Sequence, residues 1–371
     1  MQDTISIIGY GQTRFGEAWD KGLKELMDEA ITPAIDTSPC TALDIDMIVV
    51  ANMLGERMSN QAHLGSLASS LLPHHPPALR VEAACASGSI AIHTACSLLE
   101  SGKAKNILVV GVEKMTDAST EEITAALMGA ADSEKDAPSG ITFPGLFGLI
   151  AKRYMHEYGL TREELSTVSA MHHKNATKNP FAQFRKEIPA EQISASPLIA
   201  DPLRLLDCSP ISDGAAACIL SNEHKSDIRI AASQISNDTL SIADRASITS
   251  FCATKESMEK ALDEAEVNRS DISTVELHDC FSIAAIINLE DMGFATQGTG
   301  VQLYKRRNPD FSINGSGGLK ACGHPVAATG VKQIIDVSKQ LKNRKIRFGL
   351  AHNLGGTGAT CGIHILENTN A

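Results

Sequence analysis

Residues 85–106 read CASGSIAIHTACSLLESGKAKN and lead into ILVVGV, a strand-like run that begins at Ile107. Residues 324–345 read HPVAATGVKQIIDVSKQLKNRK and lead in the same way into IRFGLA, which begins at Ile346. In both cases the strand begins 22 residues after the start of the stretch, at 107 after 85 and at 346 after 324. Matched spacing of this kind indicates an internal repeat. We therefore predict that Cys85 and His324 occupy the same strand-to-helix turn in two copies of one unit.

The rest of the chain follows the same plan. Short apolar runs, such as ISIIGYG at 5–11, alternate with helical stretches, which is typical of α/β proteins with crossover connections. A second half begins near residue 228 with IRIAASQIS, and Ile272 opens a strand after a helix as Ile45 does in the first half. We predict two similar halves, 1–225 and 226–371, packed face to face, with an inserted loop domain at about 115–200. A pseudo-twofold axis between the halves would bring the Cys85 thiol to the His324 imidazole.

The composition limits the classes of function. The 371 residues are 43% hydrophobic and 21% charged, as in an ordinary globular protein. The net charge of −11 disfavours nucleic acid as a partner but leaves room for a local positive patch that holds a small anionic ligand. No apolar run reaches the roughly 20 residues of a membrane span, and Asp3 stands where a secretory signal carries a basic residue, so we expect a cytoplasmic protein. Nine cysteines, an odd number spread along the chain, indicate reduced thiols.

Two residue types at the repeated turn point to nucleophilic catalysis. Cys85 stands at the expected start of a helix, where unpaired N–H groups and the helix dipole favour a thiolate, and its small neighbours let a ligand reach the sulfur. His324 lies in a glycine-rich turn, and Pro325 suits the first position of a helix. An imidazole placed there can accept the thiol proton and hold a developing oxyanion.

A second pair of reactive side chains follows the strand STVEL. His278 and Cys280 are alternate residues, so we expect them on the same face at the end of that strand, where ligands meet the sheet in α/β proteins. A thiol there can exchange a proton with a carbon acid, while the imidazole fixes a water molecule. The alternatives are a buried core pair, or zinc held by His278, Cys280, Cys322 and His324. Zinc sites usually use cysteines two to four residues apart, so we expect no bound metal.

Positive charge gathers in the inserted region. These residues are the best candidates for holding the anionic nucleotide end of a ligand, although each one alone is more simply a solvated surface residue. The group consists of Lys152, Arg153, Lys174, Lys178, Arg185 and Lys186. Gly317 and Gly318 would allow a ligand to approach the backbone, and the turn in GLAHNLGGTGAT has N–H groups at 354–358 that can point into a site.

Several separated motifs follow one another along the chain: VEAACASG (81–88), GVEKMTD (111–117), TFPGLFGLIAKRYMHEYG (142–159), DPLRLLDCSPISDGAAA (201–217), HDCF (278–281), SGGLKACGHPVAATG (316–330) and HNLGGTGAT (352–360). Together they resemble the thiolase superfamily, and the HDCF motif resembles its sterol-carrier-protein-type branch. The resemblance implies two repeated α/β halves packed as a layered α-β-α-β-α sandwich with an inserted loop domain. Within the branch, it points to the archaeal acetyl-CoA acetyltransferases of the mevalonate pathway.

The resemblance also implies a role for each reactive residue. Cys85 would be the acyl-accepting nucleophile, His324 its base and an oxyanion donor, Cys280 the acid/base and His278 the residue that orients a water molecule. The second oxyanion hole would be formed by the backbone N–H groups of Cys85 and of the final turn, around Gly356. Better-known thiolases carry the acid/base cysteine in the last motif, where this chain has His352, and this departure favours Cys280 as the replacement. Cys322 stands where close relatives usually have another residue.

The function implied is the reversible condensation of two acetyl-CoA molecules to acetoacetyl-CoA and CoA, for isoprenoid biosynthesis. Coenzyme A thioesters would be substrates, and no cofactor would be permanently bound. The resemblance further implies a homodimer or tetramer, and a complex with 3-hydroxy-3-methylglutaryl-CoA synthase and a small zinc-containing OB-fold protein. A degradative 3-ketoacyl-CoA thiolase, a thiolase-like synthase and a non-enzymatic scaffold subunit remain as alternatives.

Overall fold

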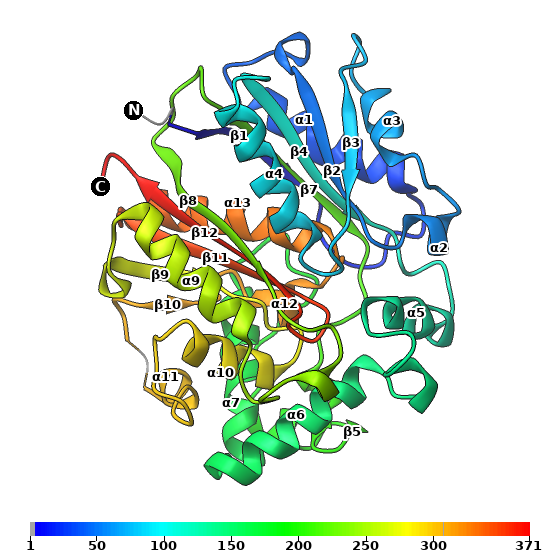
Figure 1. The fold of residues 1–371 in the computed structure, drawn as a ribbon, viewed down its shortest axis with the longest axis vertical. Coiled ribbons are helices and arrows are strands. Elements are labelled where there is room, and N and C mark those ends of the chain that lie inside the picture. The colour runs from blue at the N-terminus through cyan, green and yellow to red at the C-terminus, as the bar shows by residue number, and fades with distance from the viewer. Residues whose placement is uncertain (1–3, 307) are drawn as a thin grey trace.

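A ten-stranded sheet runs through the molecule in the computed structural model, which describes residues 4–306 and 308–371 (Figure 1). The strands follow the order β10-β9-β11-β12-β8-β1-β7-β4-β2-β3. One half contains β1 (Ser6–Gln12), β2 (Met47–Ala51), β3 (Ala78–Val81), β4 (Asn106–Glu113) and β7 (Gly214–Ser221). The other contains β8 (Ile228–Asn237), β9 (Ile272–Glu276), β10 (Ser312–Ile313), β11 (Phe348–Gly355) and β12 (Thr360–Asn368). The halves meet where Ser6 of β1 pairs with Arg229 of β8.

The two halves of the sheet have the same topology. In the first half β2 pairs in parallel with β3 and β4, and β7 joins β4 to β1 by antiparallel pairing. In the second half β9 pairs in parallel with β10 and β11, and β12 joins β11 to β8 by antiparallel pairing. The repeated α/β halves predicted from the spacing of the motifs are thus confirmed.

Helices separate and cover the two halves of the sheet (Figure 1). Helices α1 (Leu23–Asp36) and α3 (Leu64–Ser69) pack on the strands of the first half, and α9 (Cys252–Ala265) packs on β8 and β12 of the second. Between them lie α4 (Ser87–Glu100) and α13 (Ala328–Arg344), which touch each other and strands of both halves. This is the layered α-β-α-β-α arrangement expected from the sequence.

The two central helices approach each other at two glycines. A Cβ added to Gly88 of α4 would lie 2.7 Å from the carbonyl oxygen of Ala327 and 2.9 Å from the Cα of Gly330 in α13. A Cβ added to Gly330 would clash with the backbone nitrogen of Ser89 and the side-chain oxygen of Asn353. Glycine is therefore required at both positions because backbone packs directly against backbone.

We expect Gly330→Ala to destabilise the protein by about 1–3 kcal/mol or more, because the added methyl group meets backbone atoms that cannot yield like a flexible side chain. Urea unfolding of the variant and the wild type measures the difference. Gly129→Ala is the matched control, since a Cβ at Gly129 would have only the Arg57 guanidinium nearby, at 4.0 Å. Equal unfolding midpoints for Gly330→Ala and the wild type would show that the helices are not packed so closely.

The region between the halves forms a separate group of elements below the sheet in Figure 1. It contains α5 (Thr120–Leu127), α6 (Phe143–Tyr158), α7 (Arg162–Ala176), α8 (Ala190–Ser194) and the short strands β5 (Leu198–Ala200) and β6 (Leu203–Arg204). The remaining short helices are α2 (Gly55–Ser59), α11 (Val301–Lys305) and α12 (Gly318–Cys322). None of the helices in the described residues combines the length and apolar character that a membrane span requires.

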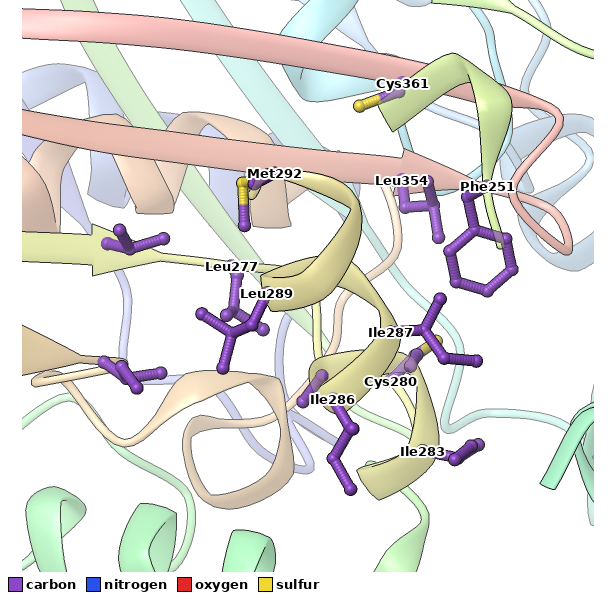
Figure 2. Close-up of a cluster of buried hydrophobic side chains, with 14 of the residues drawn as sticks. Phe251, Leu277, Cys280, Ile283, Ile286, Ile287, Leu289, Met292, Leu354 and Cys361 are labelled. Carbon is purple, nitrogen blue, oxygen red and sulfur yellow. The ribbon is translucent and has the colours of Figure 1, made fainter. Parts of the chain in front are cut away.

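Helix α10 (Ser282–Asp291) lies at the centre of a large apolar core, and all ten of its residues are buried. A helix that is surrounded by protein is apolar on every face, as the run SIAAIINL shows. Figure 2 shows Cys280 at the beginning of this helix, close to Ile283 and Ile287. The core thus fixes the position of one of the two predicted reactive thiols.

Candidate active site

Cys85 lies in a tight turn between β3 and α4. Ala84, just before it, has a positive φ of 51°, and its N–H donates to Glu82 at 2.6 Å. The Ser87 hydroxyl accepts from Ala83 N at 2.8 Å and donates to Ala84 O at 2.6 Å. The small residues noted in the sequence therefore form a hydrogen-bonded turn. It places the thiol in the same cavity as Gly356 of the final glycine-rich turn, whose backbone N–H acts to lower the pKa of the Cys85 thiol.

His324 is held in one orientation by a side chain of the helix that follows it. The Thr329 hydroxyl donates to Pro325 O at 3.1 Å and lies 2.7 Å from His324 Nδ1. Since the hydroxyl has a single proton, it accepts the hydrogen bond from Nδ1–H. The lone pair of the neutral ring is then on Nε2, which is buried and has no hydrogen-bond partner in the part of the chain that the structure describes. Such a nitrogen can accept a proton.

His278 has the opposite tautomer. The Asn353 amide nitrogen lies 3.1 Å from His278 Nδ1, and the amide oxygen accepts from Ser89 N at 3.4 Å, which sets the orientation of the amide. Nδ1 therefore accepts a hydrogen bond, and the ring proton is on Nε2. The loop itself is held by Asn288, whose amide donates to His278 O at 2.9 Å. His278 thus offers a hydrogen-bond donor where His324 offers an acceptor.

These three residues come together at one place. One ligand atom from each of Cys85, His278 and His324 lies within 4.8 Å of the other two. The imidazole rings of His278 and His324 are 5.1 Å apart and nearly perpendicular, at 84°. The turns at Cys85 and His324 therefore converge between the two halves, as the repeat predicted.

A cavity of about 360 Å³ opens onto Cys85 and His324 of this group. Its reactive lining consists of Cys85, Cys280 and His324, and Gly356 also faces it. Much of the remaining wall is apolar and comes from α5 and α6, including Leu127, Phe143 and Phe147. A cavity with apolar walls and a few convergent polar groups is typical of a binding site for a small organic substrate.

Burial keeps the resting side chains neutral. It raises the pKa of the Cys85 thiol to about 12, with Glu113 and Glu82 adding to the effect, and it raises the pKa of Cys280 well above its usual value. It also lowers the pKa of His324 to about 4 and that of His278 well below its usual value. The expectation of a thiolate stabilised by the helix start is therefore wrong for the resting site, because desolvation outweighs the N–H groups. Deprotonation of Cys85 must accompany its attack on a substrate.

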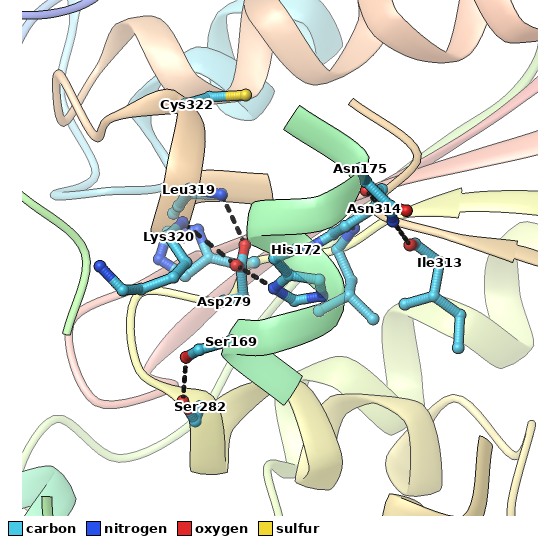
Figure 3. Close-up of polar contacts among 12 residues, drawn as sticks. Ser169, His172, Asn175, Asp279, Ser282, Ile313, Asn314, Leu319, Lys320 and Cys322 are labelled. Atoms are coloured by element: carbon cyan, nitrogen blue, oxygen red, sulfur yellow. Dashed lines mark hydrogen bonds and ion pairs between the residues drawn. The ribbon is translucent and has the colours of Figure 1, made fainter. Parts of the chain in front are cut away.

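Asp279, between His278 and Cys280, anchors their loop to the turn that carries His324 (Figure 3). Its carboxylate accepts from Leu319 N at 2.7 Å and Lys320 N at 3.2 Å, and it pairs with His172 at 2.8 Å. Gly318 has a positive φ of 61°, and a Cβ there would lie 2.5 Å from the Asp279 carboxylate. A Cβ added to Gly317 would likewise lie 2.5 Å from the Cβ of Ala176 in α7. In this structure both glycines allow close packing between segments of the protein.

Comparison with known proteins matches two family models to the chain. The model described as "Thiolase, N-terminal domain" matches residues 5–224, and that described as "Thiolase C-terminal domain-like" matches residues 235–368. The chain belongs to the thiolase family. It is therefore an acyltransferase of that family, and the resemblance found in its motifs is confirmed.

Individual relatives agree with this assignment. This thiolase is 41% identical to an acetyl-CoA acetyltransferase of Methanothermobacter thermautotrophicus, over 98% of this chain and 99% of the relative. It is 29% identical to human sterol carrier protein 2, over 96% of this chain and 70% of that protein. Among solved structures, an Ltp2–ChsH2(DUF35) aldolase superposes with a TM-score of 0.83 at 20% identity, covering 99% of this chain and 98% of that one. This last likeness concerns the fold alone.

The basic residues of the thiolase's inserted region lie apart from the reactive group. Lys152, Arg153, Lys174, Lys178, Arg185 and Lys186 are all exposed. Lys152 pairs with Asp201 at 2.6 Å, Arg153 with Glu157 at 2.6 Å and Lys174 with Glu187 at 3.4 Å. They are not among the residues that line the cavity in the described ranges. Their contact with a nucleotide therefore stays a prediction.

Two side chains left open by the sequence have structural contacts in this thiolase. His352 is fully buried, and its Nδ1 accepts from His278 N at 3.3 Å while its Nε2 lies 3.1 Å from the Thr254 hydroxyl. Cys322 is also buried, and its thiol donates to Ser316 O at 3.1 Å. Cys322 and Cys280, which belong to the zinc set considered in the sequence, are not in the metal-compatible group found among the described residues, which is Cys85, His278 and His324.

Sequence reasoning missed four residues that support the thiolase site. Asn353 and Thr329 set the histidine tautomers, and Cys208 lines the cavity beside Cys280. Glu113 accepts from Asn52 at 2.8 Å, Leu54 N at 2.9 Å, Met53 N at 3.1 Å and Ala327 N at 3.2 Å, and so ties the end of β4 to the start of α13. Burial raises the pKa of Glu113 to about 7. All four lie within motifs already quoted, but their contacts span up to 264 residues of sequence, as between Ser89 and Asn353.

Proposed function

We propose that this thiolase is an acetyl-CoA C-acetyltransferase, which condenses two acetyl-CoA molecules to acetoacetyl-CoA and CoA through an acetyl group on Cys85. The observation that supports it most directly is the convergence of Cys85, His278 and His324 within 4.8 Å beside a cavity that also contains Cys280. The identity to an archaeal relative named acetyl-CoA acetyltransferase supports the choice of acyl group.

In the first half-reaction Cys85 Sγ attacks the thioester carbon of acetyl-CoA. His324 Nε2, whose lone pair is free, takes the thiol proton during the attack. CoA then leaves as a thiol with a proton from Cys280. The products are acetyl-Cys85, a protonated His324 and the thiolate of Cys280. No other acid or base is needed, because neutral His324 has accepted the Cys85 proton and neutral Cys280 has supplied the proton of the leaving CoA.

In the second half-reaction the Cys280 thiolate removes a proton from the methyl group of a second acetyl-CoA. The enolate oxygen accepts hydrogen bonds from protonated His324 and from a water molecule oriented by His278 Nε2–H. The enolate carbon attacks acetyl-Cys85, and the new oxyanion lies at the N–H groups of Cys85 and Gly356. Collapse of this intermediate releases acetoacetyl-CoA and the Cys85 thiolate, which recovers its proton from His324. All protons then return to their starting positions.

His278→Ala should lower the condensation rate by roughly 10²–10³-fold, because removal of one donor to an oxyanion typically costs that much. The proposal places His278 at the enolate, so acetylation of Cys85 should fall far less than condensation. Steady-state condensation and single-turnover acetylation, measured on the same variant, separate the two. His63→Ala, at an exposed histidine, is the control and should keep wild-type rates. If the variant is impaired equally in both half-reactions, His278 does not act specifically on the enolate of the second one.

The length of the acyl chain separates the main alternatives. A degradative 3-ketoacyl-CoA thiolase would use the same residues on longer chains, and a synthase would not cleave acetoacetyl-CoA with free CoA. We expect thiolysis by the purified enzyme, with acetoacetyl-CoA preferred over 3-ketoacyl-CoA substrates of increasing length. A preference for long chains would favour the degradative enzyme, and absence of thiolysis would favour the synthase or the scaffold subunit.

Further parts of the proposal concern the assembly and its setting. We propose a cytoplasmic homodimer or tetramer of the mevalonate pathway, with chain halves 1–225 and 226–371, with coenzyme A thioesters as substrates and with no permanently bound cofactor. We also propose that the thiolase forms a complex with 3-hydroxy-3-methylglutaryl-CoA synthase and a zinc-containing OB-fold protein. Co-purification with candidate partners, followed by the thiolysis assay, tests this part.

A further inference from the structure

The reactive group has the donor types and the arrangement of a metal site with an open position. One thiol and two imidazoles place one ligand atom each within 4.8 Å of one another. Each Nδ1 already has a partner, Thr329 for His324 and Asn353 for His278, so each ring turns its Nε2 toward the others. Nε2 of His324 is buried and lacks a hydrogen-bond partner among the described residues, and 92% of the His324 surface is buried since 8% is exposed.

We propose that Cys85, His278 and His324 together form a binding site for a thiophilic divalent cation, above all zinc, and that bound zinc inhibits the enzyme. Zinc binds cysteine sulfur and histidine nitrogen, and three protein ligands with a free fourth position form a common zinc site. The cavity beside Cys85 supplies that fourth position for a water molecule. Zinc here is an inhibitor that competes with the acyl group, not a cofactor of the reaction.

The site needs only small side-chain movements to close around the ion. With Zn–S near 2.3 Å and Zn–N near 2.0 Å, tetrahedral geometry places neighbouring ligand atoms about 3.3–3.6 Å apart. The ligand atoms are now at most 4.8 Å apart, so a contraction of roughly 1 Å, through rotation of the side chains, is sufficient. On binding, the zinc ion exchanges three of its water molecules for one sulfur and two nitrogens, and the Cys85 thiol proton passes to solvent.

Asn353 weakens this site and so allows a sharp test of it. A metal-bound imidazole usually donates its other N–H to an acceptor, whereas Asn353 donates to Nδ1 of His278. Zinc binding therefore requires the Asn353 amide to turn and to give up the hydrogen bond from Ser89, which is long at 3.4 Å. Asn353→Asp offers an acceptor without that rotation. We expect it to tighten zinc binding by about 10–100-fold, the usual size of such an effect.

Binding is measured by titrating the purified full-length protein with Zn²⁺ in a calorimeter and with Co²⁺ in a spectrophotometer. Co²⁺ accepts the same ligands and gives a thiolate charge-transfer absorption that reports a sulfur ligand. The expected result is one strong site per chain whose charge-transfer band is lost in Cys85→Ala and kept in Cys252→Ser, a change at the exposed cysteine. Unchanged binding in Cys85→Ala, loss in Cys252→Ser or no strong site in the wild type would each overturn the proposal.

A second measurement does not depend on the folding of any variant. Zn²⁺ added to the wild-type protein should protect Cys85 from iodoacetamide, as read by peptide mass spectrometry, while Cys252 continues to react. Labelling of Cys85 at an equal rate with and without saturating Zn²⁺ would overturn the proposal.

The inhibition rests on the proposed function, whereas the binding does not. Zn²⁺ should abolish acetylation of Cys85, and acetyl-CoA added first should in turn prevent the charge-transfer band with Co²⁺. If Zn²⁺ binding depends on Cys85 but leaves turnover unchanged, the proposed role of Cys85 is refuted while the proposed metal site stands. The two failures are therefore distinguishable.

Discussion

Cys85→Ala is expected to lose acetylation of the enzyme completely and to lower condensation and thiolysis by roughly 10⁴-fold or more, as removal of a covalent nucleophile does in other enzymes. The reason is that every step of the proposed reaction passes through the Cys85 sulfur. Histidines and a second thiol remain in the cavity, but the mechanism gives no other side chain the role of acyl acceptor. Mass spectrometry of the protein after incubation with acetyl-CoA measures the acetyl group, and a coupled assay measures turnover.

Cys252→Ala provides the matched control for that experiment. It also removes one cysteine, but an exposed one at the start of α9, and it should become acetylated and turn over normally. Thermal unfolding of both variants checks that each is folded. Turnover near the wild-type rate in Cys85→Ala would refute the assignment of the nucleophile.

Cys280→Ala is expected to separate the two half-reactions. The variant retains Cys85 and His324, so Cys85 should still become acetylated, more slowly because the leaving CoA receives its proton from water. It should form the carbon–carbon bond at least about 10²-fold more slowly, since it lacks the base that takes the methyl proton. Acetylated protein should therefore accumulate. Exchange of deuterium from solvent into the methyl group of acetyl-CoA, expected in the wild type, should be lost as well.

A Cys280→Ala variant that condenses normally would move the acid/base role to another group. His352 is poorly placed for it, because both nitrogens of its ring lie against buried partners, the His278 N–H and the Thr254 hydroxyl. Burial also lowers the pKa of His352 to about 3, so its ring holds a proton weakly. Cys208, which lines the same cavity, would then be the next residue to replace.

The fold could be predicted from the sequence because the internal repeat gives the two halves motifs with the same spacing. The 22-residue spacing after Cys85 and His324 fixed the length of helix and turn in both halves, and the pseudo-twofold argument then placed the two side chains together. The placement of Cys85 beside His324 does not depend on side-chain packing, because related turns in related halves converge by symmetry.

The remaining features of the site depend on contacts that leave no local pattern. The tautomers of His278 and His324 are set by Asn353 and Thr329, and only the folded chain shows which nitrogen each one faces. The protonation state of Cys85 depends on such contacts as well, because a helix start is visible in a sequence whereas the desolvation that raises the pKa of the Cys85 thiol to about 12 is not.

The cavity has two kinds of wall with separate origins. Two of its reactive groups, Cys85 and His324, stand on turns beside α4 and α13, whose backbones touch at Gly88 and Gly330, whereas Leu127, Phe143 and Phe147 come from the region between the halves. Substitutions in α5 and α6 can therefore reshape the space for an acyl group without loosening the helices that carry the chemistry. Protein engineers who seek longer or branched products can therefore begin with substitutions in α5 and α6. Evolution of the substrate range can proceed through the same helices.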